Sequence, residues 1–342
     1  MAARTALEPS APSASTTTPS TSKSESRRPG LTEAAVRVKG VSKHFGMKVA
    51  VDDLTMYVPG GMVYGLIGPN GAGKTTTFSM LAGYLAPSEG QIEVLGFRPT
   101  QVNELRGRLG VLPQDAMLPA TDTVGDFLVH MGRLQGIPRV KAMSKAREAL
   151  EEVAGKDWWK TRCGALSHGM AKRVALAQAL LGEPEVVLLD EPTAGLDPRV
   201  AYEVRQLIKS RKGRCTLIVS SHNLQELEEI CDAAAILDRG RLVASGTIAE
   251  LTASTEEVHF HVTPPREPPG AKIPLDAVRA IPVIKLAEYD DIRNELAVHF
   301  DRDKADAEGI IDAVLRVLLE HRVRISGVSK GRGLEQRVMD LT

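Results

Sequence analysis

The sequence has few cysteines and no long apolar run. Its three cysteines, Cys163, Cys215 and Cys231, are widely spaced and form no CxxC pair, so neither a zinc knuckle nor a disulfide framework is predicted. Free thiols fit a reducing compartment. No apolar stretch approaches the roughly 18–20 residues that cross a bilayer, and no charged N-terminal region precedes an apolar one. We therefore expect neither a membrane span nor a signal peptide.

An excess of charge of either sign is also absent. Lys plus Arg is 43 and Asp plus Glu is 43, which gives a formal net charge of zero. This balance argues against a strongly basic nucleic-acid binder, so we expect no nucleic acid as a partner. The content of 43% hydrophobic and 25% charged residues is typical of a globular protein, and 342 residues predict roughly two domains.

Changes in composition along the chain indicate three segments. Residues 1–33 are rich in Ser, Thr and Pro, and such a segment buries too little apolar surface to become ordered, so we expect a disordered tail. Residues 34–253 contain strands separated by helices, a pattern typical of parallel pairing in an α/β sheet. Residues 254–342 differ in composition from the preceding segment and are expected to form an accessory α+β domain.

The elements expected in this accessory domain follow the order βαββαβ, which predicts a ferredoxin-like topology. The run from Pro264 to Gly270 is too rich in proline for a helix or an inner strand. A helix over 333–341 is expected to close the chain. The six elements are predicted at 257–262 (strand), 275–280 (helix), 282–288 and 294–300 (strands), 304–321 (helix) and 322–328 (strand).

Residues 121–160 are predicted to be helical. Thr123 can cap a helix that includes Asp126–Leu134. Trp158 and Trp159 are interpreted as packing residues of this region, with contact to a partner protein as the alternative. The buried face of a second helix is predicted from apolar residues three to four positions apart, namely Met143, Ala146, Leu150 and Val153.

A glycine-rich run lies directly between a predicted strand and a predicted helix, and it fits the pattern GxxxxGK[ST]. Glycines allow backbone amides to surround phosphate oxygens, and the helix presents its positive end to the same anion. Lys74 is expected to reach the β- and γ-phosphates, and the Thr75 hydroxyl to ligate Mg²⁺. The residues expected to bind nucleotide here are Gly68, Pro69, Asn70, Gly71, Ala72, Gly73, Lys74, Thr75 and Thr76.

Two acidic residues, Asp190 and Glu191, end a second apolar strand, which begins near Glu185. Such a strand lies inside the sheet and places Asp190 at the carboxyl edge, beside the phosphate loop. One carboxylate can hold Mg²⁺, and the next can polarise an attacking water. We assign the metal to Asp190 and the general base to Glu191.

The segment from Leu166 to Arg173, which reads LSHGMAKR, precedes this strand. With the two motifs above, it resembles the signature segment of the ATP-binding subunits of ABC transporters. The resemblance covers roughly residues 35–250. It implies an α/β P-loop ATPase domain of the ABC type with mixed sheets, a helical subdomain at about residues 115–168, and hydrolysis of ATP.

Other positions match the family in order along the chain. The resemblance implies that Gln114 belongs to the glutamine loop, which touches Mg²⁺ and faces the membrane partner. Asp197 belongs to a loop that crosses the dimer interface, which we call the D-loop. His222 matches the switch histidine that contacts the γ-phosphate, and Phe45 falls where an aromatic ring stacks on adenine. We count Lys74, Gln114, Glu191 and His222 as catalytic.

The resemblance also implies partners. Two ATP-binding subunits dimerise head to tail, as a homodimer or a heterodimer, and each ATP lies between one phosphate loop and the partner's Ser167 and Gly169. The dimer drives a separate transmembrane permease from the cytoplasmic face of the membrane. The accessory domain and the closing helix resemble a subgroup that exports drugs, lipids and polysaccharides.

Two other functions compete with transport. A soluble ABC ATPase that remodels ribosomes or DNA is the first, but such proteins carry paired ATPase units, coiled coils or zinc modules, and none is visible. A subunit that cannot hydrolyse ATP is the second, and the presence of Lys74, Glu191 and His222 argues against it.

The signature segment departs from the family pattern at two positions. His168 and Met170 stand where the family has Gly and Gln. Neutral variation is one interpretation. The other is that the His168 side chain tunes the ATP-bound dimer in a pH-dependent way.

Overall fold

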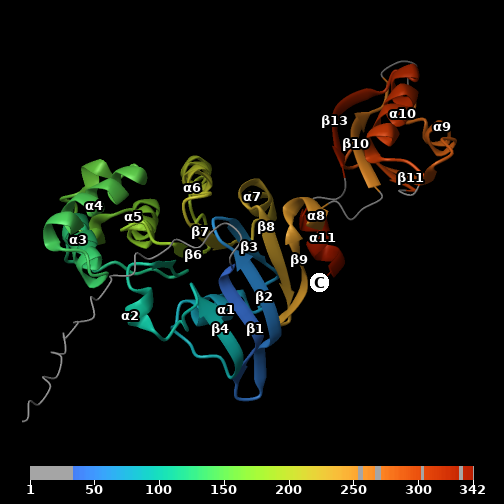
Figure 1. Ribbon diagram of the computed structural model, residues 1–342. Helices are drawn as coiled ribbons and strands as arrows, with labels where there is room; N and C mark the ends of the chain where they lie inside the picture. Colours follow the sequence, from blue (N-terminus) through green and yellow to red (C-terminus); the bar gives the residue numbers. More distant parts are fainter. Residues whose placement is uncertain (1–33, 253–256, 266–270, 302–303, 331–333, 342) are drawn as a thin grey trace, which may run out of the picture.

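The computed structural model describes residues 34–252, 257–265, 271–301, 304–330 and 334–341 (Figure 1). The tail expected at residues 1–33, and residues 266–270 of the proline-rich run, lie outside the described residues. Within the described part of the chain, the strands form three sheets of three, six and four strands. None of the described helices is both long enough and apolar enough to cross a bilayer.

The smallest sheet is antiparallel and lies at the N-terminal end of the described chain. Val36, Val38 and Val41 are fully buried, whereas Arg37 and Lys39 are exposed, and the pairing with β2 shifts register between Val38 and Val41. The strand order is β2-β1-β4, with bounds β1 Ala34–Phe45, β2 Lys48–Pro59 and β4 Glu89–Val94.

The six-stranded sheet carries most of the candidate functional site. All residues of its inner strands β3, β6 and β7 are buried, and successive residues of these strands belong to two different hydrophobic cores, so both faces are covered. The order is β5-β6-β7-β3-β8-β9, and only β9 pairs antiparallel. The bounds are β3 Val63–Ile67, β5 Leu109–Leu112, β6 Val186–Asp190, β7 Thr216–Ser220, β8 Ala233–Asp238 and β9 Arg241–Thr247.

The helices comprise a group next to this sheet and a helical region at one end of the molecule, which contains α3, α4 and α5 (Figure 1). The first group is α1 Lys74–Leu81, α2 Val102–Leu105, α6 Pro198–Ser210, α7 Leu224–Ile230 and α8 Ile248–Thr252. The helical region has α3 Val124–Leu134, α4 Arg139–Glu152 and α5 His168–Leu180, with single 3-10 turns at Lys156–Trp158 and Cys163–Ala165.

The sequence predicts this helical region well, with one error. Thr123 caps α3, because its side chain accepts a hydrogen bond from the amide of Asp126 at 3.1 Å. The predicted buried face of α4 is correct at Ala146 but wrong at Met143, which is 45% exposed. Ala142 is buried instead, because each residue turns about 100° around a helix and Met143 falls at the edge of the inward stripe.

Trp158 and Trp159 pack within the helical region, as predicted. The guanidinium carbon of Arg173 lies 4.6 Å from the ring centroid of Trp158, and that of Arg147 lies 4.2 Å from the centroid of Trp159. A Cβ atom added to Gly125 would lie 2.5 Å from the Trp159 ring. The indole therefore fills the space beside α3 that glycine leaves.

The accessory region has the predicted element order βαββαβ. Its four strands are antiparallel throughout, in the order β11-β12-β10-β13, and α10 covers one face of the sheet through buried residues such as Val314 and Leu318. The bounds are β10 Glu257–Thr263, α9 Leu275–Arg279, β11 Ile284–Asp290, β12 Glu295–Phe300, α10 Ala307–Glu320 and β13 Arg324–Lys330.

The last helix, α11 (Leu334–Leu341), does not pack on the accessory sheet that precedes it. It contacts α7 and α8, and Figure 1 shows it beside α8. Leu334 and Val338 are buried in the core that also contains β6 and β7 residues, and the amide of Leu334 donates to Glu228 of α7 at 3.2 Å. The final helix therefore completes the core around the six-stranded sheet.

This packing predicts that α11 stabilises the six-stranded sheet and its helices. Leu334→Ala should lower the free energy of unfolding by about 2–4 kcal/mol, because it removes a fully buried side chain and leaves a cavity. Met339→Ala on the same helix is the control, since Met339 is 63% exposed. Urea unfolding followed by circular dichroism measures both variants, and equal stability of the two would contradict the packing role.

Candidate functional site

The glycine-rich loop follows β3 and is pressed closely against its neighbours. Gly73 has a φ of 98°, and a Cβ atom added there would lie 2.6 Å from the carbonyl oxygen of Ala50. A Cβ atom at Gly68 would lie 2.2 Å from the carbonyl oxygen of Leu237. Only glycine fits at either position. The loop can therefore turn its amides toward one anion, next to the N-terminus of α1.

Lys74 is the first residue of α1, and its ammonium group lies over this loop. Nζ donates to the carbonyl oxygens of Gly68 at 2.6 Å and Pro69 at 3.1 Å. Burial lowers the pKa of Lys74, and the charges of Glu191 and Asp190 oppose that shift. The carboxylates of β6 therefore lie within electrostatic range of the loop, as the sequence predicts.

The two acidic residues share a serine that sequence analysis did not assign. The Ser220 hydroxyl donates a hydrogen bond to Oδ1 of Asp190, and its oxygen accepts from the amide of Glu191 at 3.1 Å. Burial raises the pKa of Asp190, whereas the hydrogen bond from Ser220 and the charges of Lys172 and Lys74 lower it. Glu191 has a φ of 51°, in the left-handed region of backbone conformation that residues other than glycine rarely adopt. The hydrogen bond from its amide to the Ser220 hydroxyl helps to hold this conformation.

His222 faces the carboxylate of Glu191. Its Nδ1 lies 2.8 Å from Oε2 of Glu191, and the side chain of Glu191 is 11% exposed whereas that of His222 is 68% exposed. A carboxylate with one oxygen held by a histidine is restricted in orientation, and the partner histidine remains accessible from solvent.

Thr75, Gln114 and Asp190 line one cavity of about 190 Å³. These three are the residues predicted to ligate Mg²⁺. A hydroxyl, an amide oxygen and a carboxylate are the hard oxygen donors that Mg²⁺ prefers, so the donor set fits the ion.

The signature segment and the D-loop lie next to each other. Ser167 caps α5 by accepting from the Met170 amide at 3.3 Å, and Asp197 caps α6 by accepting from the Val200 amide at 3.1 Å. A Cβ atom added to Gly195 would lie 2.9 Å from Nε2 of His168. His168 therefore packs on the backbone just before Asp197.

Two further groups, the signature segment and Phe45, are predicted to contact nucleotide. Within the described residues, no hydrogen bond links Ser167 or Gly169 to the loop. Phe45 is the last residue of β1 and is half exposed, and the Lys43 ammonium lies 5.3 Å from its ring centroid, so a cation partly occupies one ring face.

Comparison with known proteins agrees with the motifs. The family model described as "ABC transporter" matches residues 51–194. A Nod factor export ATP-binding protein I of Paraburkholderia xenovorans is 36% identical over 226 residues, which are 66% of this chain and 74% of that protein. A daunorubicin resistance ATP-binding protein, DrrA3 of Streptomyces coeruleorubidus, is 38% identical over 227 residues, 66% of this chain and 72% of that protein.

The chain belongs to the ABC transporter family. It is the ATP-binding subunit of an ABC transporter and an ATPase, as the sequence predicts. A solved ATP-binding subunit of an ABC transporter has a TM-score of 0.59 at 27% identity, covering 64% of this chain and 91% of that one. The protein cbiO1 of Clostridium perfringens, part of the ABC transporter complex cbiONQ, has a TM-score of 0.56 at 27% identity, covering 64% and 90%. The predicted fold of the ATPase domain is confirmed.

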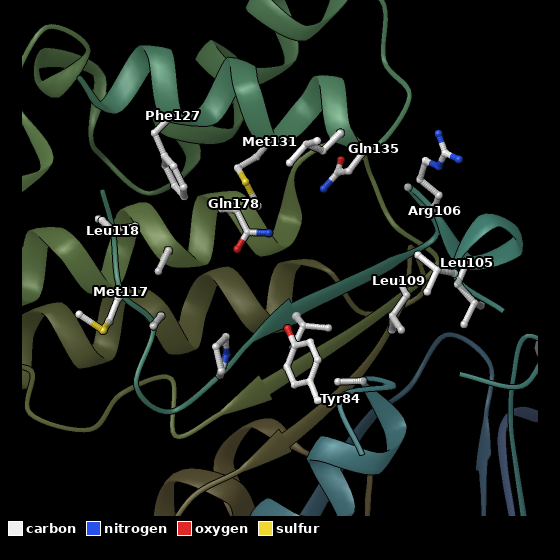
Figure 2. Close-up of a pocket in the computed structure, with 18 of the residues that line it drawn as sticks. Tyr84, Leu105, Arg106, Leu109, Met117, Leu118, Phe127, Met131, Gln135 and Gln178 are labelled. Atoms are coloured by element: carbon white, nitrogen blue, oxygen red, sulfur yellow. The ribbon is translucent and has the colours of Figure 1, made fainter. Parts of the chain in front are cut away.

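The ABC ATPase also has a groove that sequence analysis did not predict. It has a volume of about 540 Å³ and lies between α3 and α5 on one side and β5 with Tyr84 on the other (Figure 2). Phe127 and Met131 of α3 line it, as do Met117 and Leu118 from the segment after Gln114. It shares Tyr84 and Asp115 with the cavity of Thr75 and Asp190, so groove and cavity are neighbours.

Sequence analysis missed two further polar residues of the ABC ATPase site. Ser220 is the first residue of the Ser-Ser-His run that contains His222. Its position at the end of an apolar strand is the sequence signal from which it could have been found. Lys172 lies in the signature segment and is buried, with its Nζ 3.3 Å from the carbonyl oxygen of Gln114. Nothing in the sequence indicates that a lysine near the start of a helix is buried.

The close contact at Gly73 predicts loss of nucleotide binding in Gly73→Ala, because the added methyl group forces the loop away from Ala50. We expect ATP affinity to fall at least tenfold, a loss of about 1.4 kcal/mol or more. Gly213→Ala is the control, since Gly213 has a similar φ of 77° but nothing within 4 Å of an added Cβ. Titration with a fluorescent ATP analogue measures both, and unchanged affinity of Gly73→Ala would contradict the steric argument.

Proposed function

We propose that this ATP-binding subunit powers an exporter. The observation that carries the catalytic part is the meeting of the phosphate loop, Asp190, Glu191 and His222 at one edge of the six-stranded sheet. The direction of transport is supported by relatives that are named for Nod factor export and for daunorubicin resistance.

Each residue of the site has a distinct role in this proposal. The loop from Gly68 to Thr76 and the Lys74 ammonium bind the phosphates of ATP, because they concentrate amide donors and positive charge at one point. Glu191 is the general base that polarises the attacking water. His222 orients the Glu191 carboxylate through the 2.8 Å contact and reaches the γ-phosphate with its exposed ring.

We propose that Mg²⁺ is held by Thr75, Asp190 and Gln114, which line the 190 Å³ cavity beside the loop. When bound, the ion would offset the negative charge of the phosphate oxygens. Asp190 is buried, and the hydroxyl of Ser220 fixes the orientation of its carboxylate toward this cavity.

We propose that ATP binds between two ATP-binding subunits. Phe45 stacks on adenine with an exposed ring, and Ser167 and Gly169 reach the ATP on a second subunit, since they begin a helix whose positive end suits a phosphate. Asp197 lies beside this helix start, packed there through the Gly195–His168 contact, and crosses the same interface.

The groove beside the glutamine loop is the proposed docking site of a separate transmembrane permease. Its lining is mostly apolar, and it adjoins the cavity of Thr75 and Asp190, so a partner seated there would touch the segment that holds Gln114. This contact would place the subunit at the cytoplasmic face of the membrane.

The domain limits are also proposals: an ATPase domain over residues 34–253, with its helical subdomain at about residues 115–168, and an accessory domain that starts near residue 254. The packing of α11 on α7 and α8 supports one change to these limits, in which α11 belongs to the ATPase domain. We propose that the four-stranded part stabilises the dimer, with regulation of dimer opening or contact with a partner as the alternative.

Two substitutions separate the proposed catalytic roles. Glu191→Gln should abolish ATP turnover and accumulate an ATP-bound dimer, because it removes the base but keeps the phosphate loop. Lys74→Ala should weaken ATP binding itself, by about tenfold or more, because it removes the cation over the loop. Phosphate release and size-exclusion chromatography with ATP measure both effects. Full turnover by Glu191→Gln would refute the base assignment.

Docking in the groove predicts that Met117→Glu loses the permease. Met117 is 93% exposed and lines the groove, so a charge there should block an apolar contact without disturbing the fold. Ile292→Glu is the control, since Ile292 is 90% exposed in the accessory region. Each change is made in tagged Glu191→Gln protein, which is captured with ATP from gently solubilised membranes of its native cells.

We expect a polypeptide with several long apolar spans to accompany the parent and the Ile292→Glu protein but not the Met117→Glu protein. Capture by all three would contradict docking in the groove. Ribosomal proteins or nucleic acid without a membrane protein would favour the soluble remodelling ATPase instead.

A further inference from the structure

Lys172 is a buried cation that the roles proposed above do not use. It lies in the second turn of α5 and is 9% exposed. Burying an ammonium group costs free energy unless hydrogen bonds and opposite charges compensate for lost water. Its Nζ donates to the backbone carbonyl oxygen of Gln114 at 3.3 Å, which is a neutral partner. The remaining compensation must come from charges at longer range.

Those charges belong to the catalytic edge of the sheet. Burial lowers the pKa of Lys172, and the carboxylates of Asp190, Glu191 and Asp115 oppose this shift. In turn, the Lys172 charge lowers the pKa of Asp190. Lys172 therefore lies within electrostatic range of both acidic residues that end β6, although it comes from a helix of the helical region.

The group that Lys172 holds lies on a segment without regular structure. Between the end of β5 at Leu112 and the start of α3 at Val124, the chain forms turns but neither helix nor strand. Gln114 lies in this segment and lines the cavity of Thr75 and Asp190, and the residues Asp115–Leu118 after it line the groove. The position of the segment depends on side-chain contacts of this kind, because no helix or strand hydrogen bonds fix it.

We propose that Lys172 is a positioning residue for the ATPase reaction: its ammonium group ties the backbone of Gln114 to α5 and so fixes the glutamine relative to Asp190. This inference rests on the proposed function of Gln114. It assigns to α5 a second task besides presenting Ser167 and Gly169. A displacement of α5 or of the groove segment then moves Gln114 with it.

The alternative is that Lys172 only fills space in the core. The methionine side chain is one atom shorter than that of lysine and lacks the charge, so Lys172→Met keeps most of the packing and removes both the hydrogen bond and the charge. Arginine restores a charged donor. Lys145→Met in α4 is the matched control, because it removes a lysine of the helical region that pairs with Glu148 and Glu183 and not with Gln114.

The experiment measures ATP turnover, ATP affinity, thermal unfolding and backbone amide hydrogen exchange on the full chain. In Lys172→Met we expect kcat to fall roughly ten- to hundredfold with KM for ATP unchanged, as for a misplaced catalytic group. Amide exchange in the peptide covering residues 113–118 should quicken several-fold. Lys172→Arg should recover most of both losses, and Lys145→Met should behave like the parent.

Two outcomes would overturn the proposal. One is a Lys172→Met protein with the kcat and the amide exchange of the parent. The other is a loss explained entirely by a lower unfolding temperature, which would indicate a packing role. Failure of the proposed function is distinguishable, because a parent protein that neither binds nor hydrolyses ATP would show it before any variant is compared.

Discussion

The register of three buried parallel strands fixes the geometry on which the site depends. β7 lies between β3 and β6, and its last residue, Ser220, pairs with Asp190 on one side and with Leu66 on the other. The phosphate loop begins two residues after Leu66, and His222 comes two residues after Ser220. A slip of one residue would move a carboxylate by about 3.3 Å, farther than a hydrogen bond can stretch. Close packing on both faces of the strands opposes such a slip.

This register also determines the charge balance of the site. Lys74 reaches it from the phosphate loop and Lys172 from α5, while Asp190 and Glu191 reach it from the end of β6. Two cations and two carboxylates offset one another, so their mutual attraction compensates part of the cost of burial. Within the described part of the chain, neither lysine forms an ion pair at hydrogen-bond distance; both donate to backbone carbonyl oxygens. Lys74 can therefore turn toward phosphate oxygens without breaking a strong pair.

The sequence predicts the parts of this structure that rest on local pattern. The cap at Thr123 and the βαββαβ order are correct because each depends on neighbouring residues. The prediction at Met143 fails because the edge of a helical stripe depends on where the helix starts and on what it faces.

Features formed by segments that are far apart along the chain could not be predicted from the sequence. The amphipathic helix α11 buries an apolar face, but periodicity does not say whether it packs on the accessory sheet or on α7 and α8. The groove is lined by residues that lie between Ala82 and Gln178 in the sequence. The burial of Lys172 depends on the packing of α5 against the segment that contains Gln114. Motif spacing predicts the nucleotide residues, whereas the hydrogen bonds that Ser220 and Lys172 make with Asp190, Glu191 and Gln114 are visible only in the fold.

The place of α11 changes how the accessory domain can act on the ATPase site. The chain leaves the ATPase domain after α8 and returns to it as α11, so the four-stranded region is attached at two points rather than one. α11 packs on α7, and α7 begins two residues after His222, with Asn223 as its cap. A domain on one linker can move independently of its neighbour, whereas two attachments restrict that motion. α11 therefore places the part of the chain that follows the four-stranded sheet against a helix that begins two residues after His222.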